Sequence, residues 1–280
     1  MLARGDDPQG PPLPGSARRG ALPPLVAVAH GSRDPRAAAT VEALLELVRQ
    51  RAGRSGLSGL RVSAAFLGHA APSPRQVLDA LPAGLVVVLP LLLTAAYHSE
   101  TDLPAALRAA STRRGGGLEI RYGRPLGPHP LLTSALGRRL RETGATMSPA
   151  ETSVVLAAAG SSDPAATATV AALAAHWRAQ RRWRDVIPAY ASSTGPTPAA
   201  AVAALSASGA RHVLVASYLL APGRFASQIR DQALGAGATA VSGVLGAAPE
   251  LAAIILRRYA EAAFAVPAAA LPSTGQARIA

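Results

Sequence analysis

The chain contains one strand-to-helix turn twice, and this repeat constrains its fold more than any other feature. The segment LVAVAHGSRDP spans residues 25–35, and VVLAAAGSSDP spans residues 154–164. In each, an apolar run leads through a Gly-Ser pair to Asp-Pro, a helix N-cap followed by proline at the first helical position. Three further markers recur in the same order, so that the four offsets lie between 119 and 129 residues. The sequence therefore predicts two similar tandem units.

Short apolar runs alternate with Ala- and Leu-rich amphipathic segments in each unit. In the first unit we expect strands at 25–30, 60–67, 85–93 and 118–122, and helices at 35–51, 74–81, 102–111 and 130–141. Such alternation is typical of a parallel sheet flanked by helices. We therefore predict an α/β fold of two tandem domains with a ligand cleft between them.

The expected domain limits follow from composition and from the repeat. They are a disordered N-terminal tail (1–23), a first domain that holds the metal site (24–146), a degenerate second domain (150–266) and a flexible C-terminal tail (267–280). The first tail is rich in Pro, Gly and charge and has no hydrophobic signal region. No apolar run approaches the ~20 residues that cross a bilayer, so we expect a cytoplasmic protein with no membrane partner.

Two residue types are missing, and their absence excludes several kinds of site. There is no Cys, and all 28 basic residues are Arg. Thiolate nucleophiles, disulfides, iron–sulfur clusters, Schiff bases and a P-loop lysine are therefore excluded. The net charge of +12 and the 4% aromatic content do not come with a basic, aromatic-lined helix face, so we expect no nucleic acid partner. Arginines of this number suit a small polyanionic substrate equally well.

The histidines of the first unit are all lost from the second. The aligned pairs are His30 with Ala159, His69 with Ser193, His98 with Phe225 and His129 with Ala248. Because the frame is kept and each of these imidazoles is replaced, the replacement indicates that the metal site lies in the first unit.

His30 and His98 each follow an apolar strand, at the carboxyl edge where open α/β sheets bind ligands. Two imidazoles there suit a divalent first-row metal and also accept protons near neutral pH. We predict His30 and His98 as catalytic metal ligands, with His69 as a further ligand. The alternative for any single one of them is a hydrogen bond that fixes a loop. Glu100 and Asp102 are possible auxiliary carboxylates, although Asp102 is equally well placed to cap a helix.

Three segments resemble the sirohydrochlorin chelatase family, the class II tetrapyrrole chelatases that include sirohydrochlorin ferrochelatase and anaerobic cobalt chelatase. They are HGSRDP at 30–35, VVVLPLLLTAAYHSETDLP at 86–104 and PLGPHPLL at 125–132. The resemblance covers about residues 24–263. It implies ATP-independent insertion of Fe²⁺ or Co²⁺ into sirohydrochlorin, for siroheme or cobalamin, by a pseudo-dimeric monomer. No cofactor is implied beyond the inserted metal.

The resemblance also implies roles for individual residues. His30 and His98 match the metal-handling histidines of the family. Gly31, Ser32 and Arg33 are expected to bind the substrate, Arg33 through a peripheral carboxylate, with Arg36 and Arg224 as weaker candidates. Family members often carry Glu at the position of Gly68, so His69 is a candidate for the role of that carboxylate. A non-catalytic carrier of tetrapyrrole or metal remains the alternative, because it needs the cleft and the arginines but no proton-accepting histidine.

Overall fold

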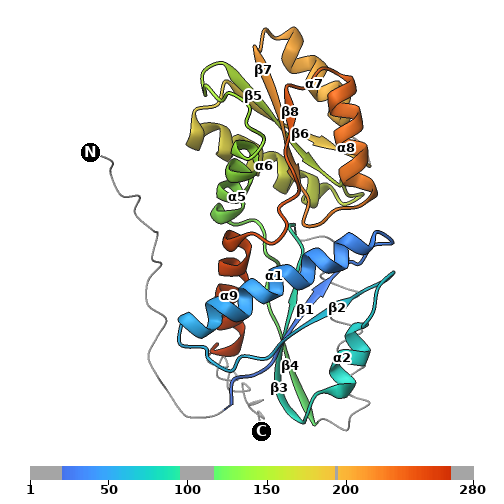
Figure 1. Ribbon diagram of the computed structural model, residues 1–280, viewed down its shortest axis with the longest axis vertical. Helices are drawn as coiled ribbons and strands as arrows, with labels where there is room; N and C mark the ends of the chain where they lie inside the picture. The colour runs from blue at the N-terminus through green and yellow to red at the C-terminus, as the bar shows by residue number, and fades with distance from the viewer. Residues whose placement is uncertain (1–20, 95–116, 193–194, 266–280) are drawn as a thin grey trace, which may run out of the picture.

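The computed structural model describes residues 21–94, 117–192 and 195–265, and its two halves repeat one plan (Figure 1). The first half contains β1 (Leu25–Ala29), α1 (Pro35–Arg54), β2 (Val62–Phe66), α2 (Pro74–Ala80), β3 (Gly84–Pro90), β4 (Leu118–Tyr122) and α5 (Pro130–Arg141). The second contains β5 (Thr152–Ala158), α6 (Pro164–Arg181), β6 (Asp185–Tyr190), α7 (Pro198–Ala207), β7 (His212–Tyr218), α8 (Arg224–Gly235), β8 (Ala240–Val241) and α9 (Pro249–Ala263).

Each half is built on a four-stranded parallel sheet. The strand orders are β2-β1-β3-β4 and β6-β5-β7-β8, with β1 and β5 in equivalent inner positions. Both strands are buried along their whole length, as expected for parallel strands covered on both faces. The predicted α/β fold with two tandem units is confirmed.

The repeated Asp-Pro turns begin α1 and α6 in the same way. The Asp34 carboxylate accepts a hydrogen bond from the backbone N–H of Arg36 at 3.0 Å, and Asp163 accepts one from that of Ala165 at 2.8 Å. Each aspartate thereby satisfies one of the free amides of a helix N-terminus, next to a proline that has none to satisfy. The frame that both halves share is therefore architectural.

The last helix of each half packs against the sheet of the other half, as Figure 1 shows for α5 and α9. Helix α9 lies along α1 and β3, and α5 lies against β7. Hydrogen bonds follow this exchange: Arg121 of β4 donates to the carbonyl of Ala263 at 2.9 Å, and Arg139 of α5 donates to that of Leu245 at 2.8 Å. Each packed unit therefore contains a helix from the other half of the chain. The domain boundary expected at residues 146–150 stays a prediction.

One hydrophobic core runs through both halves between the sheet faces that carry α1, α5, α6 and α9. The fully buried Trp177 and Tyr259 belong to it. A second core lies under α7 and α8, and a smaller one lies between the first sheet and α2. Because both sheets contribute to the main core, their packing sets the position of one sheet relative to the other.

The described elements differ from the expected ones mainly at their ends. The first strand ends at Ala29, one residue before His30, and α1 extends to Arg54 instead of residue 51. The helix expected at 102–111 lies outside the described residues. In the part of the chain that the structure covers, no helix combines the length and the apolar character needed to cross a membrane.

Candidate active site

The predicted site residues that the structure describes lie at the carboxyl edge of the first sheet. His30 immediately follows β1, and His69 lies three residues after the end of the adjacent strand β2. The two exits remain paired beyond the strands: the N–H of Leu67 donates to the carbonyl of Ala29 at 3.0 Å, and that of Gly68 donates to the carbonyl of His30 at 3.1 Å. His30 and the turn that carries His69 are therefore neighbours, as expected, and both side chains are exposed.

The backbone of Gly31 approaches that of Gly68 so closely that no side chain fits between them. Gly31 has a φ of 84°, and a Cβ placed on it would lie 1.8 Å from the carbonyl oxygen of Gly68. Glycine is therefore required at position 31 both by the left-handed backbone and by the neighbouring strand exit. Its expected part in substrate binding stays a prediction, since the turn alone explains it.

Ser32 also has a place in the turn, because its hydroxyl oxygen accepts a hydrogen bond from the N–H of Asp34 at 3.1 Å. Ser161 does the same for Asp163 in the second half at 3.0 Å. The hydroxyl of Ser32 retains its own proton to donate to a ligand. Its assignment to substrate binding is therefore compatible with the turn but is not required by it.

The arginines near this turn differ in how they are engaged. The guanidinium of Arg36 holds the carboxylate of Asp34 through Nε at 3.0 Å and Nη2 at 2.6 Å. That hydrogen bond lowers the pKa of Asp34. Arg33 is exposed, and within the described residues no carboxylate pairs with it. Of the two, Arg33 is the one whose guanidinium is available to a substrate carboxylate.

His69 occupies an unusual backbone conformation, with a φ of 61°. A non-glycine residue in this region is uncommon, and such strain is often found at functional sites. An added Cβ at Gly68 would meet nothing within 4 Å, so the backbone leaves space for a side chain at the position where the family resemblance leads us to expect Glu. The missing side chain is thus not the result of crowding, and His69 is the titratable side chain beside it.

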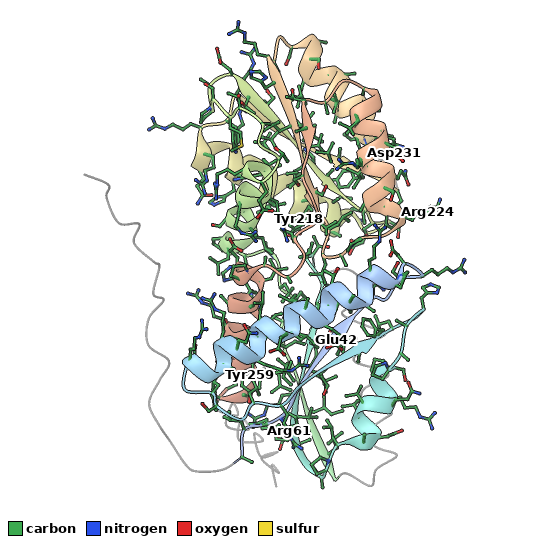
Figure 2. The ribbon with its side chains drawn as sticks, in the orientation of Figure 1. Glu42, Arg61, Tyr218, Arg224, Asp231 and Tyr259 are labelled. Atoms are coloured by element: carbon green, nitrogen blue, oxygen red, sulfur yellow. The ribbon has the colours of Figure 1, made fainter. Side chains whose placement is uncertain are left out.

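The second half supplies a facing surface from the start of α8. A Cβ at Gly223 would lie 3.2 Å from the hydroxyl oxygen of Ser32, so the helix begins against the turn that follows His30. Figure 2 shows Arg224 at the end of α8 nearest the first half, while Asp231 lies farther along the helix. Arg224 and Phe225 are both exposed. The turn that follows His30 and the start of α8 therefore lie against each other, and a ligand cleft at this place stays a prediction.

Tyr218, at the end of β7, joins the two halves directly. Its hydroxyl donates to the carbonyl of Leu93, just beyond β3, at 2.8 Å. Figure 2 shows the side chain between the two sheets. Burial raises the pKa of Tyr218 far above its usual value, so the phenol stays protonated as a donor. Sequence reasoning missed this residue, because a tyrosine that ends an apolar strand carries no sign of its partner.

His129 serves the fold, as expected from its position between two prolines. Its Nδ1 accepts a hydrogen bond from the N–H of Leu131 at 3.1 Å and caps α5. Burial, and then the charges of Arg258 and Arg257, lower the pKa of His129. The ring is therefore held neutral, which its acceptor role requires.

Three predicted residues, His98, Glu100 and Asp102, lie outside the described residues. Among the residues with described positions, no three His, Asp or Glu side chains gather closely enough to hold a metal ion. The predicted ligand set of His30, His69 and His98 therefore stays a prediction. A cavity of about 480 Å³ lies elsewhere, between α5, α8 and β8. Its residue Arg139 is already bonded to Glu142 and Leu245, and we assign it no role in the chemistry.

The model of the CbiX family matches residues 24–143 and 153–262, one match in each half. A sirohydrochlorin cobaltochelatase from Priestia megaterium is 28% identical over 73% of this chain, and the chain spans 66% of that protein. A sirohydrochlorin ferrochelatase from the same organism is 26% identical over 73% of this chain and 76% of its own length. The structure is similar to that of SirB from Bacillus subtilis with Fe³⁺, with 25% identity and a TM-score of 0.73. The match covers 86% of this chain and 96% of the SirB chain.

Proposed function

The chain belongs to the CbiX family, as the resemblance to sirohydrochlorin chelatases implied, and on this premise we propose that it inserts Fe²⁺ or Co²⁺ into sirohydrochlorin. Relatives named for each of the two metals support both ions as substrates. Imidazole ligands accept either metal, so the residues do not select between them. ATP has no part in the reaction as proposed.

The observation that carries the proposal is the position of His30. It follows the inner strand β1, is exposed, and lies beside the turn of His69, and the turn after it meets Gly223 of the second half. The equivalent position of the second half is Ala159. The edge of the first half thus presents imidazoles, and the equivalent position of the second half presents none.

The chemistry needs both properties of an imidazole. As the divalent ion enters the ring, its two central pyrrole N–H protons must leave, so one side of the macrocycle needs metal ligands and proton acceptors. Neutral His30 and His98 would hold the ion first, and each would take one of the two protons once the ion has passed into the ring, because one imidazole lone pair cannot bind a metal and a proton at the same time. His69 then completes the set as a third acceptor. Arg33 would pair with a peripheral carboxylate and orient the ring.

The decisive experiment mixes the purified protein with sirohydrochlorin and either Fe²⁺ or Co²⁺, and follows the absorption spectrum of the macrocycle. We expect insertion at a rate well above that in buffer, without ATP. Tight binding of sirohydrochlorin with no acceleration would instead identify a carrier. If the protein neither binds sirohydrochlorin nor accelerates insertion, both the chelatase and the carrier hypotheses are refuted.

A further inference from the structure

The start of α8 is held rigidly against the candidate site. The Nε2 of Gln228 donates to the carbonyl of Ala191, just beyond β6, at 2.7 Å, and ties the first two turns of α8 to the sheet. Gly223, directly before the helix, has a φ of 155° and approaches Ser32 as described above. The side chains at positions 224 and 225 are therefore presented from a fixed backbone beside the turn that follows His30.

Phe225 is an exposed aromatic residue next to this contact, with 38% of its surface accessible. Among the described residues the exposed large hydrophobic side chains are Leu67, Phe225, Leu234 and Phe264. Two of them lie at carboxyl edges: Leu67 directly follows β2, beside the exit of β1, and Phe225 is the second residue of α8, which follows β7. Exposed apolar side chains at these two edges suit a ligand with a broad apolar face, which a tetrapyrrole ring has.

Arg224 provides the complementary charge. It is exposed, and no acidic side chain in the described ranges 21–94, 117–192 and 195–265 pairs with it. In this respect it differs from Arg138, whose guanidinium is engaged by Glu250. An unpaired guanidinium beside an exposed phenyl ring matches a macrocycle whose face is apolar and whose rim carries carboxylates.

We propose that Arg224 and Phe225 are substrate-positioning residues of the second half, with Phe225 in contact with one face of the ring and Arg224 paired with a peripheral carboxylate. The inference rests on the proposed function and assigns a task to the half that lost its histidines. In the aligned sequence Phe225 stands where the first half has His98. The aligned position would thus supply a metal ligand in one half and an apolar contact in the other.

The test measures sirohydrochlorin binding without metal, by absorbance or fluorescence titration, and then KM and kcat for insertion. We expect F225A and R224Q each to raise Kd and KM about tenfold, equivalent to about 1.4 kcal/mol. We expect kcat at saturating substrate to change less than about threefold, because uniform binding is lost and the imidazoles are untouched. Raised salt should weaken binding by the wild type more than binding by R224Q.

Two substitutions on the same helix serve as matched controls. R230Q removes an exposed arginine from the middle of α8, and L234A removes an exposed apolar side chain near its far end. If F225A and R224Q bind sirohydrochlorin as the controls do, the inference is overturned while the proposed function stands. If the wild type itself fails to accelerate insertion, the proposed function fails, and the metal-free titration still decides whether Arg224 and Phe225 bind the ring. Thermal unfolding of each variant confirms that it is folded.

Discussion

Replacing Gly31 by alanine tests whether the site depends on the close approach of two strand exits. The new Cβ would lie 1.8 Å from the carbonyl oxygen of Gly68, whereas ordinary contacts begin at 3.4 Å. The exits of β1 and β2 would have to separate by roughly 1.5 Å, and such overpacking costs about 1–3 kcal/mol. The left-handed φ of 84° adds about 1–2 kcal/mol of strain for a side-chain-bearing residue.

We therefore expect G31A to lose about 2–5 kcal/mol of unfolding free energy, measured by urea denaturation. Two glycines separate the contributions. Gly56 has a φ of 76° with nothing within 4 Å, so G56A carries strain alone. Gly68 has open space around its Cα and no left-handed φ, so G68A should cause neither overpacking nor backbone strain. Because His30 directly precedes the displaced turn, we expect insertion by G31A to slow about a hundredfold.

The structure predicts that the free energy of unfolding decreases in the order G68A, G56A, G31A. If G31A unfolds at the same urea concentration as G56A, the contact with Gly68 does not constrain position 31, and the reasoning fails. If G31A is destabilised yet inserts metal at the wild-type rate, the turn does not position His30 for the chemistry.

Three further predictions concern single side chains. H30A and H98A should each reduce insertion to the rate in buffer with the unfolding temperature preserved; activity in both would mean that other residues hold the metal. H129N should keep the helix cap but remove a titrating group. Because burial lowers the pKa of His129 in the folded state below 6.5, the unfolded chain takes up the proton first as the pH falls. The stability of the wild type should therefore decrease as the pH drops below about 6.5. Urea titrations at pH 5 and 8 should show a smaller loss for H129N. Y218F leaves the carbonyl of Leu93 without its donor and should cost about 1–3 kcal/mol; an unchanged midpoint would contradict a buried bond.

Much of the fold could be predicted because its signals are local. The Asp-Pro pairs at 34–35 and 163–164 predict helix starts that the structure confirms, and the segment at 130–141 is a helix over the predicted residues. The placement of His30 at a strand exit follows from the same reasoning. These features depend on neighbouring residues and on the period of apolar side chains, which the sequence displays directly.

The features that could not be predicted depend on partners distant in sequence. The residues next to Gly31 in the sequence do not predict its contact with Gly68. The hydrogen bond from Tyr218 to Leu93 likewise joins residues 125 positions apart. The sequence shows the pairing of His98 with Phe225 in the repeat, but only the close approach of Gly223 to Ser32 shows that the start of α8 lies beside the turn after His30. Such contacts are set by the packing of the halves and leave no periodic signal.

The exchange of α5 and α9 has a consequence during synthesis. As the chain leaves the ribosome, residues 24–146 emerge first, but the sheet that they form is completed by α9, which ends at Ala263. Arg121 has no carbonyl partner at Ala263 until 142 further residues have been translated. A nascent chain that stops before α9 therefore exposes an unfinished apolar surface next to His30's own sheet. Premature termination should yield a substrate for proteases and chaperones instead of a half-active enzyme.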